Sequence, residues 1–523
     1  MSKVFKDLNL QLDERVEEKL NLLSPNWGSY RILKKSVDAR KSPHFVYSLE
    51  VFDQNEKPPE DNFQLEKLSQ FKGTKPLIIG AGPAGLFAAL RLLERGIACT
   101  LIEQGSPAEK RIKGINRYWR YGELDPKNNV CFGEGGAGLY SDGKLITRIK
   151  SPHIPYVMQR LVEFGAPDEI KYLSNPHVGS DKIRRVIPVM RKKLLELGCD
   201  IRYDTKVSKL LTQGSNIIGV ETDLGEQIHS NHVVLAIGHS ANDFFQHLSE
   251  VGVFLEGKSF AMGVRVEHPQ NLINSIQYKD KAEHPALGSA NYKLTHHDKK
   301  TNTGVFSFCM CPGGYVLSSG TEADSIVCNG MSNYKRNSPY ANSAVVVTVD
   351  HKKLFGDDLF GGFKLRRQIE VEAFNLVQKQ GGTKQLPTQN MLDFLNKSLK
   401  KQVNKGSSPS GETLVPLHEV FPEDLYKSLS KGLESFENKM KGFVTEKSQV
   451  YGVETRTSCP LRITRDKQSL ESISHKGLYP TGEGAGYAGG ITSAACDGIN
   501  VADAIYELYK SSKTDQALHL SQK

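Results

Sequence analysis

The 523-residue sequence predicts an α/β protein in which two distant stretches of chain build one parallel sheet. Three observations support this fold class. Residues 76–104 run strand, glycine turn, helix and strand, residues 232–240 form an apolar strand ending in Ala-x-Gly, and residues 477–509 form a strand leading into a glycine-opened helix. The chain between the last two stretches changes to alternating strand patterns and amphipathic helices. It therefore predicts an inserted domain of mixed α+β structure.

The predicted domains follow from these changes of pattern. A small N-terminal α+β module takes residues 1–70, with a helix at 12–24 and strands at 31–37 and 44–52. The sheet domain is discontinuous and takes residues 72–250 and 451–512. The inserted domain takes residues 251–450, with apolar stripes that predict helices over 364–380 and 423–438. Residues 513–523 are expected to form a tail.

Composition narrows the class of protein. The chain is 38% hydrophobic and 24% charged, which is typical of a globular protein. Its net charge of +9 is spread along the chain, without an aromatic-interleaved basic stripe, so we do not expect nucleic-acid binding. No run approaches 18 apolar residues and no N-terminal apolar core indicates a signal peptide, so no membrane association is expected. Eight cysteines do not form a disulfide scaffold, and we expect reduced thiols and a cytoplasmic location.

The first glycine turn has the spacing of a dinucleotide-binding site. Gly80, Gly82 and Gly85 give G-x-G-x-x-G between an apolar strand and the helix at 86–95. In such a turn the three glycines allow the bend, the approach of a pyrophosphate and the packing of the helix. The second strand ends at Glu103, about 20 residues on, where an acid meets a ribose hydroxyl. An acid there argues against a 2′-phosphate, which leaves FAD or NAD.

A second G-x-G-x-x-G lies at Gly133, Gly135 and Gly138, but no apolar helix follows it. We therefore interpret it as a loop that lets backbone pass close to a flat or phosphorylated ligand, and expect one nucleotide turn rather than two.

The C-terminal stretch favours FAD over NAD. Gly482 and Glu483 end a strand, and a helix then begins near Thr492 or Ser493. The carboxylate can accept a hydrogen bond from a ribityl hydroxyl. The helix N-terminus can face the N1–C2=O edge of a flavin, which gains negative charge on reduction. NAD has no group that would use this helix.

These stretches resemble a known FAD-binding pattern. GAGPAG with Glu103, VVLAIG and GLYPTGEGAGYAGG are similar to the Rossmann-like FAD-binding domain of glutathione-reductase-type flavoproteins. Residues 131–145, 308–316, 329–344 and 453–463 also resemble a bacterial family of FAD-dependent dehydrogenases whose substrate is unassigned. The resemblance implies a pyrophosphate at the first turn, the adenosine ribose at Glu103, adenine beside Val207 and the flavin at Gly490 and Ile491. The implied cofactor-binding residues are Gly80, Ala81, Gly82, Pro83, Ala84, Gly85, Glu103, Gln104, Gly135, Gly136, Ala137, Gly138, Val207, Gly238, Gly482, Glu483, Gly490 and Ile491.

Five residues are candidates for the chemistry. Cys309 and Cys311, two apart on a predicted strand, would face one ligand as a redox pair, or would be two buried strand cysteines. Arg456 and Arg462 would clamp a substrate anion, or form salt bridges within the protein. His239 would act as a base beside the cofactor, or cap a helix. No Cys or His pairs have ligand spacing, so we expect no metal site.

The sequence thus predicts an FAD-dependent oxidoreductase that passes a hydride from a small-molecule substrate, or from NAD(P)H as a transient donor, through flavin N5. Three alternatives stay open: a thiol–disulfide flavoenzyme using the Cys309 and Cys311 thiols, a flavin-dependent RNA-modifying enzyme, and a non-catalytic FAD-binding protein. Substrate, electron acceptor and oligomeric state are left open as well.

Overall fold

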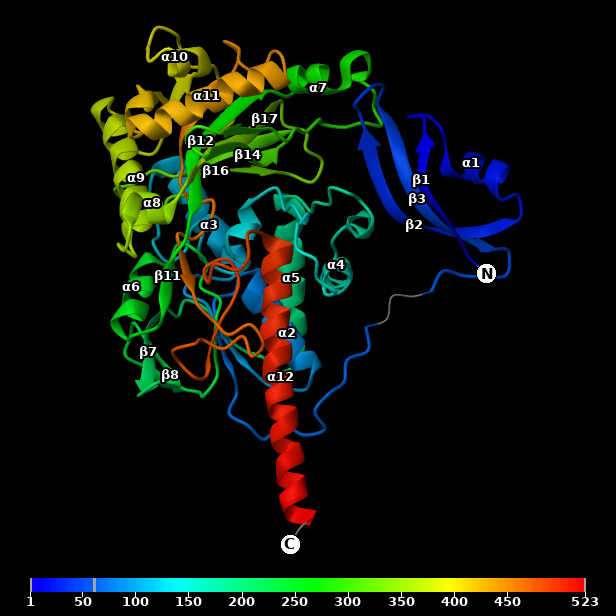
Figure 1. The fold of residues 1–523 in the computed structure, drawn as a ribbon, viewed down its shortest axis with the longest axis vertical. Helices are drawn as coiled ribbons and strands as arrows, with labels where there is room; N and C mark the ends of the chain where they lie inside the picture. Colours follow the sequence, from blue (N-terminus) through cyan, green and yellow to red (C-terminus); the bar gives the residue numbers. More distant parts are fainter. Residues whose placement is uncertain (1, 60–62, 522–523) are drawn as a thin grey trace.

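The computed structural model describes residues 2–59 and 63–521, with side chains up to residue 511. Figure 1 shows an N-terminal module beside a larger body, and a long C-terminal helix along that body. The module contains β1 (Lys3–Leu10), α1 (Val16–Leu23), β2 (Trp27–Asp38) and β3 (His44–Asp53), with β3 central in an antiparallel sheet. Its predicted helix and two strands are confirmed. Strand β1, KVFKDLNL, lacks a regular alternation of apolar and polar residues, and it is absent from the prediction.

A five-stranded parallel sheet forms the centre of the main domain. Its order is β22-β10-β4-β5-β6, with every neighbouring pair parallel. The strands are β4 (Leu77–Ile79), β5 (Thr100–Ile102), β6 (Asp200–Arg202), β10 (Val233–Leu235) and β22 (Leu478–Pro480). The three stretches predicted to build one sheet therefore do so, and the α/β fold class is confirmed.

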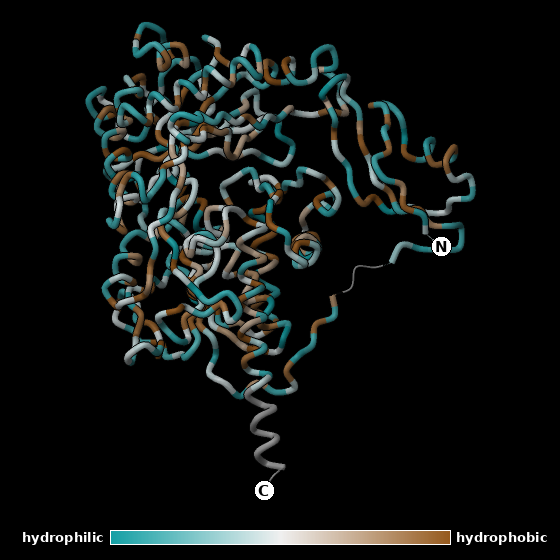
Figure 2. Tube along the Cα trace, in the orientation of Figure 1, coloured by the Kyte–Doolittle hydropathy of each residue, from teal (hydrophilic) through white to brown (hydrophobic). Residues whose placement is uncertain are grey.

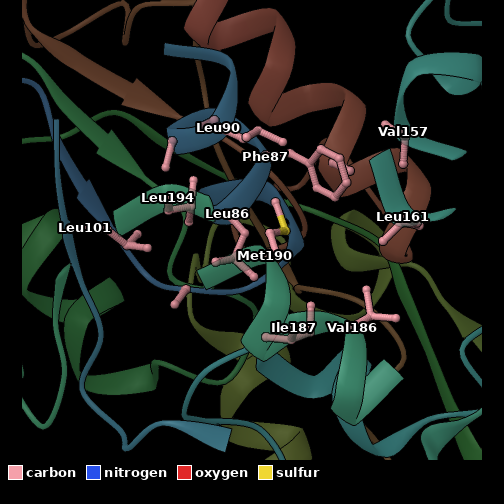
Figure 3. Packing of buried hydrophobic residues seen from close by; sticks show 14 of the residues in the cluster. Leu86, Phe87, Leu90, Leu101, Val157, Leu161, Val186, Ile187, Met190 and Leu194 are labelled. Atoms are coloured by element: carbon pink, nitrogen blue, oxygen red, sulfur yellow. The ribbon is translucent and has the colours of Figure 1, made fainter. Parts of the chain in front are cut away.

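Helices cover one face of this sheet. They are α2 (Pro83–Glu94), α3 (Ala108–Tyr121), α4 (Ile154–Glu163), α5 (Ser180–Glu196) and α12 (Ile491–Ser521). Figure 3 shows side chains of α2 and α5, including Leu86, Leu90, Met190 and Leu194, packed together over β5. Helices α2 and α12 lie side by side (Figure 1), and the Arg91 guanidinium of α2 makes two 2.8 Å hydrogen bonds to the α12 carboxylate of Asp503. Helix α12 continues to Ser521, so residues 513–521 of the predicted tail are helical.

The opposite face carries a separate antiparallel sheet of β7 (Val207–Gln213), β8 (Asn216–Thr222) and β9 (Gln227–His229), followed by α6 (Asn242–Glu250). The strand-rich sequences of 201–211 and 217–223 resemble nucleotide-fold strands. Only β6 joins the parallel sheet, because the chain turns away after Arg202 and β7 pairs with β8 instead.

The inserted domain contains a seven-stranded sheet of order β13-β14-β17-β12-β20-β18-β19. Its strands are β12 (Phe260–Pro269), β13 (Thr295–Asp298), β14 (Thr303–Cys311), β17 (Tyr340–Val349), β18 (Leu386–Asn390), β19 (Glu412–Leu414) and β20 (Gln449–Glu454). One face packs on helices α7 (Gln270–Tyr278), α9 (Gly361–Lys379) and α11 (Glu423–Lys439) through a large apolar cluster. Both helices predicted here are confirmed. The sheet runs on to Glu454, beyond the predicted boundary at 450, because β20 pairs with β12.

Short elements complete the fold. They are the hairpin β15 (Gly314–Ser318) and β16 (Cys328–Ser332), the pair β11 (Leu255–Gly257) and β21 (Leu461–Ile463), and the helices α8 (His351–Phe355) and α10 (Met391–Leu395). Figure 2 shows hydrophobic residues recurring at intervals along the elements, as expected where each element buries one face. Among the described residues no helix has the length and apolar character needed to cross a membrane.

Candidate functional site

A cavity of about 380 Å³ lies beyond the carboxyl ends of β4, β10 and β22, and reaches up to the inserted sheet. Open parallel sheets bind their ligands at this edge. Most of the predicted cofactor residues line it: Gly80, Gly82, Pro83, Ala84, Glu103, Gln104, Gly136, Ala137, Gly138, Val207, Gly238, Gly482, Glu483, Gly490 and Ile491. Ala81, Gly85 and Gly135 are not part of the lining. The sequence motifs are therefore brought together around one space.

The first glycine turn packs so tightly that side chains are excluded at two positions. Gly80 has φ of +102°, and a Cβ there would collide with the carbonyl oxygen of Ala236 on β10. A Cβ on Gly85 would collide with the Gly80 carbonyl oxygen. Gly82 instead faces open space, since the nearest atom to a Cβ there would be Gly136 Cα at 4.0 Å. Gly82 thus clears the N-terminus of α2, where free N–H groups and the helix dipole favour an anion.

Glu103 joins the two glycine loops. Its carboxylate is buried, and Oε2 accepts the Ala81 N–H at 2.8 Å. Oε1 accepts the N–H groups of Gly105 and Gly133, both at 2.9 Å. A carboxylate offers about four lone-pair positions, so one stays available for a ligand hydroxyl. The sequence predicted a ribose acceptor here and did not show this second, structural role.

The second glycine loop lies between the first turn and the start of α12. The Gly135 N–H donates to the Ala81 carbonyl at 2.8 Å, and a Cβ on Gly136 would lie 3.1 Å from Gly82 Cα. A Cβ on Gly138 would lie 3.1 Å from Ile491 Cγ1. The loop continues as a 3₁₀ turn, η1 (Gly136–Tyr140), and no α-helix follows directly, as predicted. Glycine backbone therefore lines the space between the N-terminus of α2 and the N-terminus of α12.

Arg111 on α3 holds this second loop and was not predicted. Its guanidinium is fully buried and donates to the carbonyl oxygens of Asn129, Val130, Glu134 and Gly136 at 2.7–2.9 Å, with a longer contact of 3.3 Å to that of Gly133. Burial lowers the pKa of this guanidinium. Its partners are backbone carbonyl groups of residues 129–136, and no side-chain pattern in the sequence indicates these contacts.

The start of α12 faces the cavity from the other side. Within the described chain, the backbone N–H groups of Gly490 and Ile491 have no acceptor, as expected in a first helical turn. Glu483 lines the same space, and its Oε1 lies 4.0 Å from His239 Nε2. Burial raises the pKa of Glu483 to about 7, against an opposing effect of Lys258. A proton can therefore rest on this carboxyl near neutral pH.

The inserted sheet closes the cavity from above. Phe308 and Cys309 of β14, Asn329 of β16 and Glu454 of β20 line it. Buried Arg265 of β12 ties three of them together. Its Nε donates to Glu454 Oε2 at 2.9 Å, Nη1 to the Cys309 carbonyl at 3.3 Å and Nη2 to Asn329 Oδ1 at 3.4 Å. One guanidinium therefore holds three of the residues on this side of the cavity in place.

The two candidate cysteines do not share a face, contrary to the prediction. The register of β14 against β17 shifts between Phe308 and Cys311, and Cys309 has φ of +46°, so the strand alternation is broken. Cys309 lines the cavity, whereas the Cys311 thiol does not and donates to the Cys309 carbonyl at 3.2 Å. Burial raises the pKa of both thiols, that of Cys311 to about 12. Because the thiolate is the reactive form, this geometry weighs against a redox pair.

The two arginines and the histidine are also separated. Arg456 lines the cavity, but its Nε and Nη2 donate to Glu370 at 3.1 and 2.8 Å, so the internal salt bridge is what the structure shows. Arg462 is not part of the lining, and its guanidinium lies 5.4 Å from the Tyr487 ring centre. The structure therefore does not bring the two guanidinium groups together at the cavity.

His239 does line the cavity and does not cap a helix, since α6 begins after Ala241. Burial, with Arg366 and Arg456 nearby, lowers the pKa of His239 to about 3. Its imidazole is therefore neutral at physiological pH.

Comparison with known proteins agrees with this geometry. Residues 73–116 match the FAD binding domain family, and residues 259–457 match the family described as FAD-dependent protein, C-terminal domain-like. An uncharacterized protein of Clostridium beijerinckii is 39% identical over 521 residues, covering 96% of this chain and 97% of its own. The chain belongs to the same family as this clostridial protein. The cofactor of this chain is FAD.

Solved structures of other proteins match this chain more distantly. Glycine oxidase from Bacillus cereus matches with a TM-score of 0.31 and 11% identity, over 83% of this chain and 95% of the oxidase. The flavin-dependent brominase Bmp2 matches with a TM-score of 0.34 and 13% identity, over 84% of this chain and 80% of the brominase.

Proposed function

We propose that this flavoprotein is an oxidoreductase of the glutathione-reductase type, and that its cavity holds FAD with the pyrophosphate at residues 80–85 and the flavin ring at the start of α12. One observation supports this most directly: the two ends of the main domain meet in one cavity. A Cβ on Gly482 would lie 2.9 Å from Ala84 Cβ, and a Cβ on Gly138 would lie 3.1 Å from Ile491 Cγ1. A single extended dinucleotide can therefore touch both ends.

The residues around the cavity fit each part of FAD. In the proposed arrangement the α2 N-terminus binds the pyrophosphate, and Glu103 accepts a ribose hydroxyl with its remaining lone pair. Val207 and Gly238 border the adenosine end, and Glu483 borders the ribityl chain. The glutamate is longer than the aspartate usual in related flavoproteins. Its side chain nevertheless reaches the cavity and is 28% exposed there.

Bound FAD would supply the two-electron chemistry, accepting a hydride at N5 from a substrate C–H bond or from NAD(P)H. The protein contributes position and electrostatics. The free N–H groups of Gly490 and Ile491 and the positive end of α12 would stabilise negative charge on the flavin, by about 0.3–1 kcal/mol for the dipole. The inserted sheet excludes water from the opposite side, where Phe308 lines the cavity. A small substrate would lie between that sheet and the flavin.

Anaerobic reduction of the bound flavin tests this function. FAD-loaded protein is mixed with NADH, NADPH and a panel of small metabolites, and the flavin absorbance near 450 nm is followed. We expect at least one compound to bleach it with saturation. If no donor in a broad panel bleaches a flavin that dithionite does reduce, the protein would be a non-catalytic FAD-binding protein instead.

A further inference from the structure

We propose that the substrate of this site carries a carboxylate, and that Lys144 and Asn329 bind it. The inference rests on the proposed function, because it places the anion between the flavin and the inserted sheet. Lys144 follows the second glycine loop and Asn329 belongs to β16, so the two residues approach the cavity from different domains. They would fix the substrate across the domain junction.

Lys144 is a cation of the cavity lining that keeps a free N–H donor. Its side chain is 28% exposed and lines the cavity. Within the described chain its ammonium contacts the Met310 carbonyl and Asp142 Oδ2, the latter at 3.2 Å. An ammonium has three N–H donors, so one stays available. Burial opposes the charged form, yet the charge of Asp142 holds the pKa of Lys144 above its ordinary value.

The local charge balance leaves one positive charge. Asp142 is already paired with Arg336, whose Nε and Nη2 donate to it at 3.1 and 2.6 Å. Glu454 is paired with Arg265 at 2.9 Å. Two carboxylates therefore face three cations. One excess charge matches a carboxylate, whereas a phosphate dianion would require more.

Asn329 supplies a neutral donor at the same place. Its Oδ1 accepts from Arg265 Nη2 at 3.4 Å and from the Gly330 N–H at 2.7 Å. These bonds orient the amide so that Nδ2, for which the described chain shows no acceptor, is left for a ligand. The Arg265 guanidinium also contacts the Cys309 carbonyl, next to the Met310 carbonyl that Lys144 contacts. The ammonium and the amide thus flank one short strand segment.

The other cations of the lining are neutralised by carboxylates or lie away from the flavin end. Arg456 is bound by Glu370 and Glu322, and Lys206 is paired with Asp243 beside the adenosine end. His239 is neutral at physiological pH. A carboxylate entering the flavin end therefore meets Lys144 as the available positive group among the described lining residues.

Ligand titration of the FAD-loaded protein tests the inference. FAD content is measured first, since a protein without FAD would overturn the proposed function before any ligand is added. Acetate, butyrate and benzoate are then compared with acetamide, butyramide and benzamide, following the flavin spectrum between 350 and 500 nm. We expect at least one carboxylate to perturb the spectrum with saturation and to bind at least about tenfold more tightly than its amide. Equal binding of acids and amides, or no saturation by any acid, would overturn the proposal.

Variants separate substrate binding from an effect on the flavin. Lys144→Met should weaken carboxylate binding about tenfold or more, and Lys144→Arg should restore part of it. Lys192→Met removes a lysine whose side chain is 79% exposed on α5, and should bind like the wild type. If Lys144→Met shifts the flavin potential but leaves carboxylate affinity unchanged, Lys144 acts on the flavin and the proposal is wrong. If that variant does not fold, Asn329→Asp should weaken the same carboxylate by a similar factor, and unchanged binding would refute the assignment.

Discussion

Glu103→Gln perturbs the residue that connects both glycine loops to the sheet. The wild-type carboxylate accepts three backbone N–H groups. A glutamine can keep its oxygen toward Gly105 and Gly133, and its amide group then faces the Ala81 N–H, donor against donor. Leaving that buried donor unsatisfied costs about 1–3 kcal/mol, and the two remaining bonds weaken by about 0.5–1 kcal/mol each on losing the charge. The apoprotein should therefore lose about 2–5 kcal/mol of unfolding free energy.

Urea unfolding of the apoprotein measures this loss, and titration with FAD measures the cofactor affinity. FAD should bind at least tenfold more weakly to Glu103→Gln, because the ribose acceptor and the placement of Ala81 are both disturbed. Glu196→Gln is the matched control, since that carboxylate is 52% exposed at the end of α5 and its loss should change either quantity little. A Glu103→Gln protein as stable as the wild type, binding FAD within threefold, would refute the reasoning.

Four further predictions concern single positions. Gly136→Ala places a Cβ 3.1 Å from Gly82 Cα at φ of +59°, and should weaken FAD binding in a titration. Gly214→Ala is the control, since that glycine has the same φ and nothing within 4 Å of an added Cβ. Both variants should lose about 1–2 kcal/mol of unfolding free energy, but Gly214→Ala should bind FAD normally. Cys309→Ser should change turnover less than about twofold if the thiol is not redox-active; a loss of more than a hundredfold would revive the thiol–disulfide alternative. Glu483 has its pKa raised to about 7 in the folded protein, so its contribution to stability is complete below its ordinary pKa of 4.5 and is lost as pH rises toward 7. In urea unfolding of the apoprotein, we therefore expect the unfolding free energy of Glu483→Gln, relative to the wild type, to rise by up to about 3 kcal/mol between pH 5 and pH 8. A difference between the two proteins that stays constant over this range would count against the raised pKa. Arg456→Met leaves buried Glu370 without its partner and should cost about 3–5 kcal/mol by the same assay, a value that a merely exposed salt bridge would not reach.

The glycine turns that line the cavity could be predicted because their pattern is local. A strand, three spaced glycines, a helix and an acid at Glu103 lie within 76–104, and the backbone geometry of that unit follows from the residue types. The segment ending at Gly490 and Ile491 could be joined to it because both carry glycines where a helix begins beside a strand. These features can be recognised from the spacing of residues in the sequence alone.

The remaining contacts around the cavity could not be predicted because they are long-range. Cys309 and Cys311 were placed on one face by strand alternation, and a bulge against β17 broke that alternation. Arg111 binds carbonyl groups, which leave no side-chain pattern in the sequence. The role proposed for Lys144 depends on the ion pair between Asp142 and Arg336 of the inserted domain, which the sequence does not indicate.

The central claim is that one molecule bridges the first glycine turn and the start of α12. Calorimetric titration of the apoprotein with FAD, FMN and ADP tests it, since FMN reaches only the flavin end and ADP only the adenosine end. We predict one FAD per chain, bound at least a hundredfold more tightly than either fragment. FMN or ADP binding as tightly as FAD would contradict the claim, because no ligand would then need both ends of the cavity.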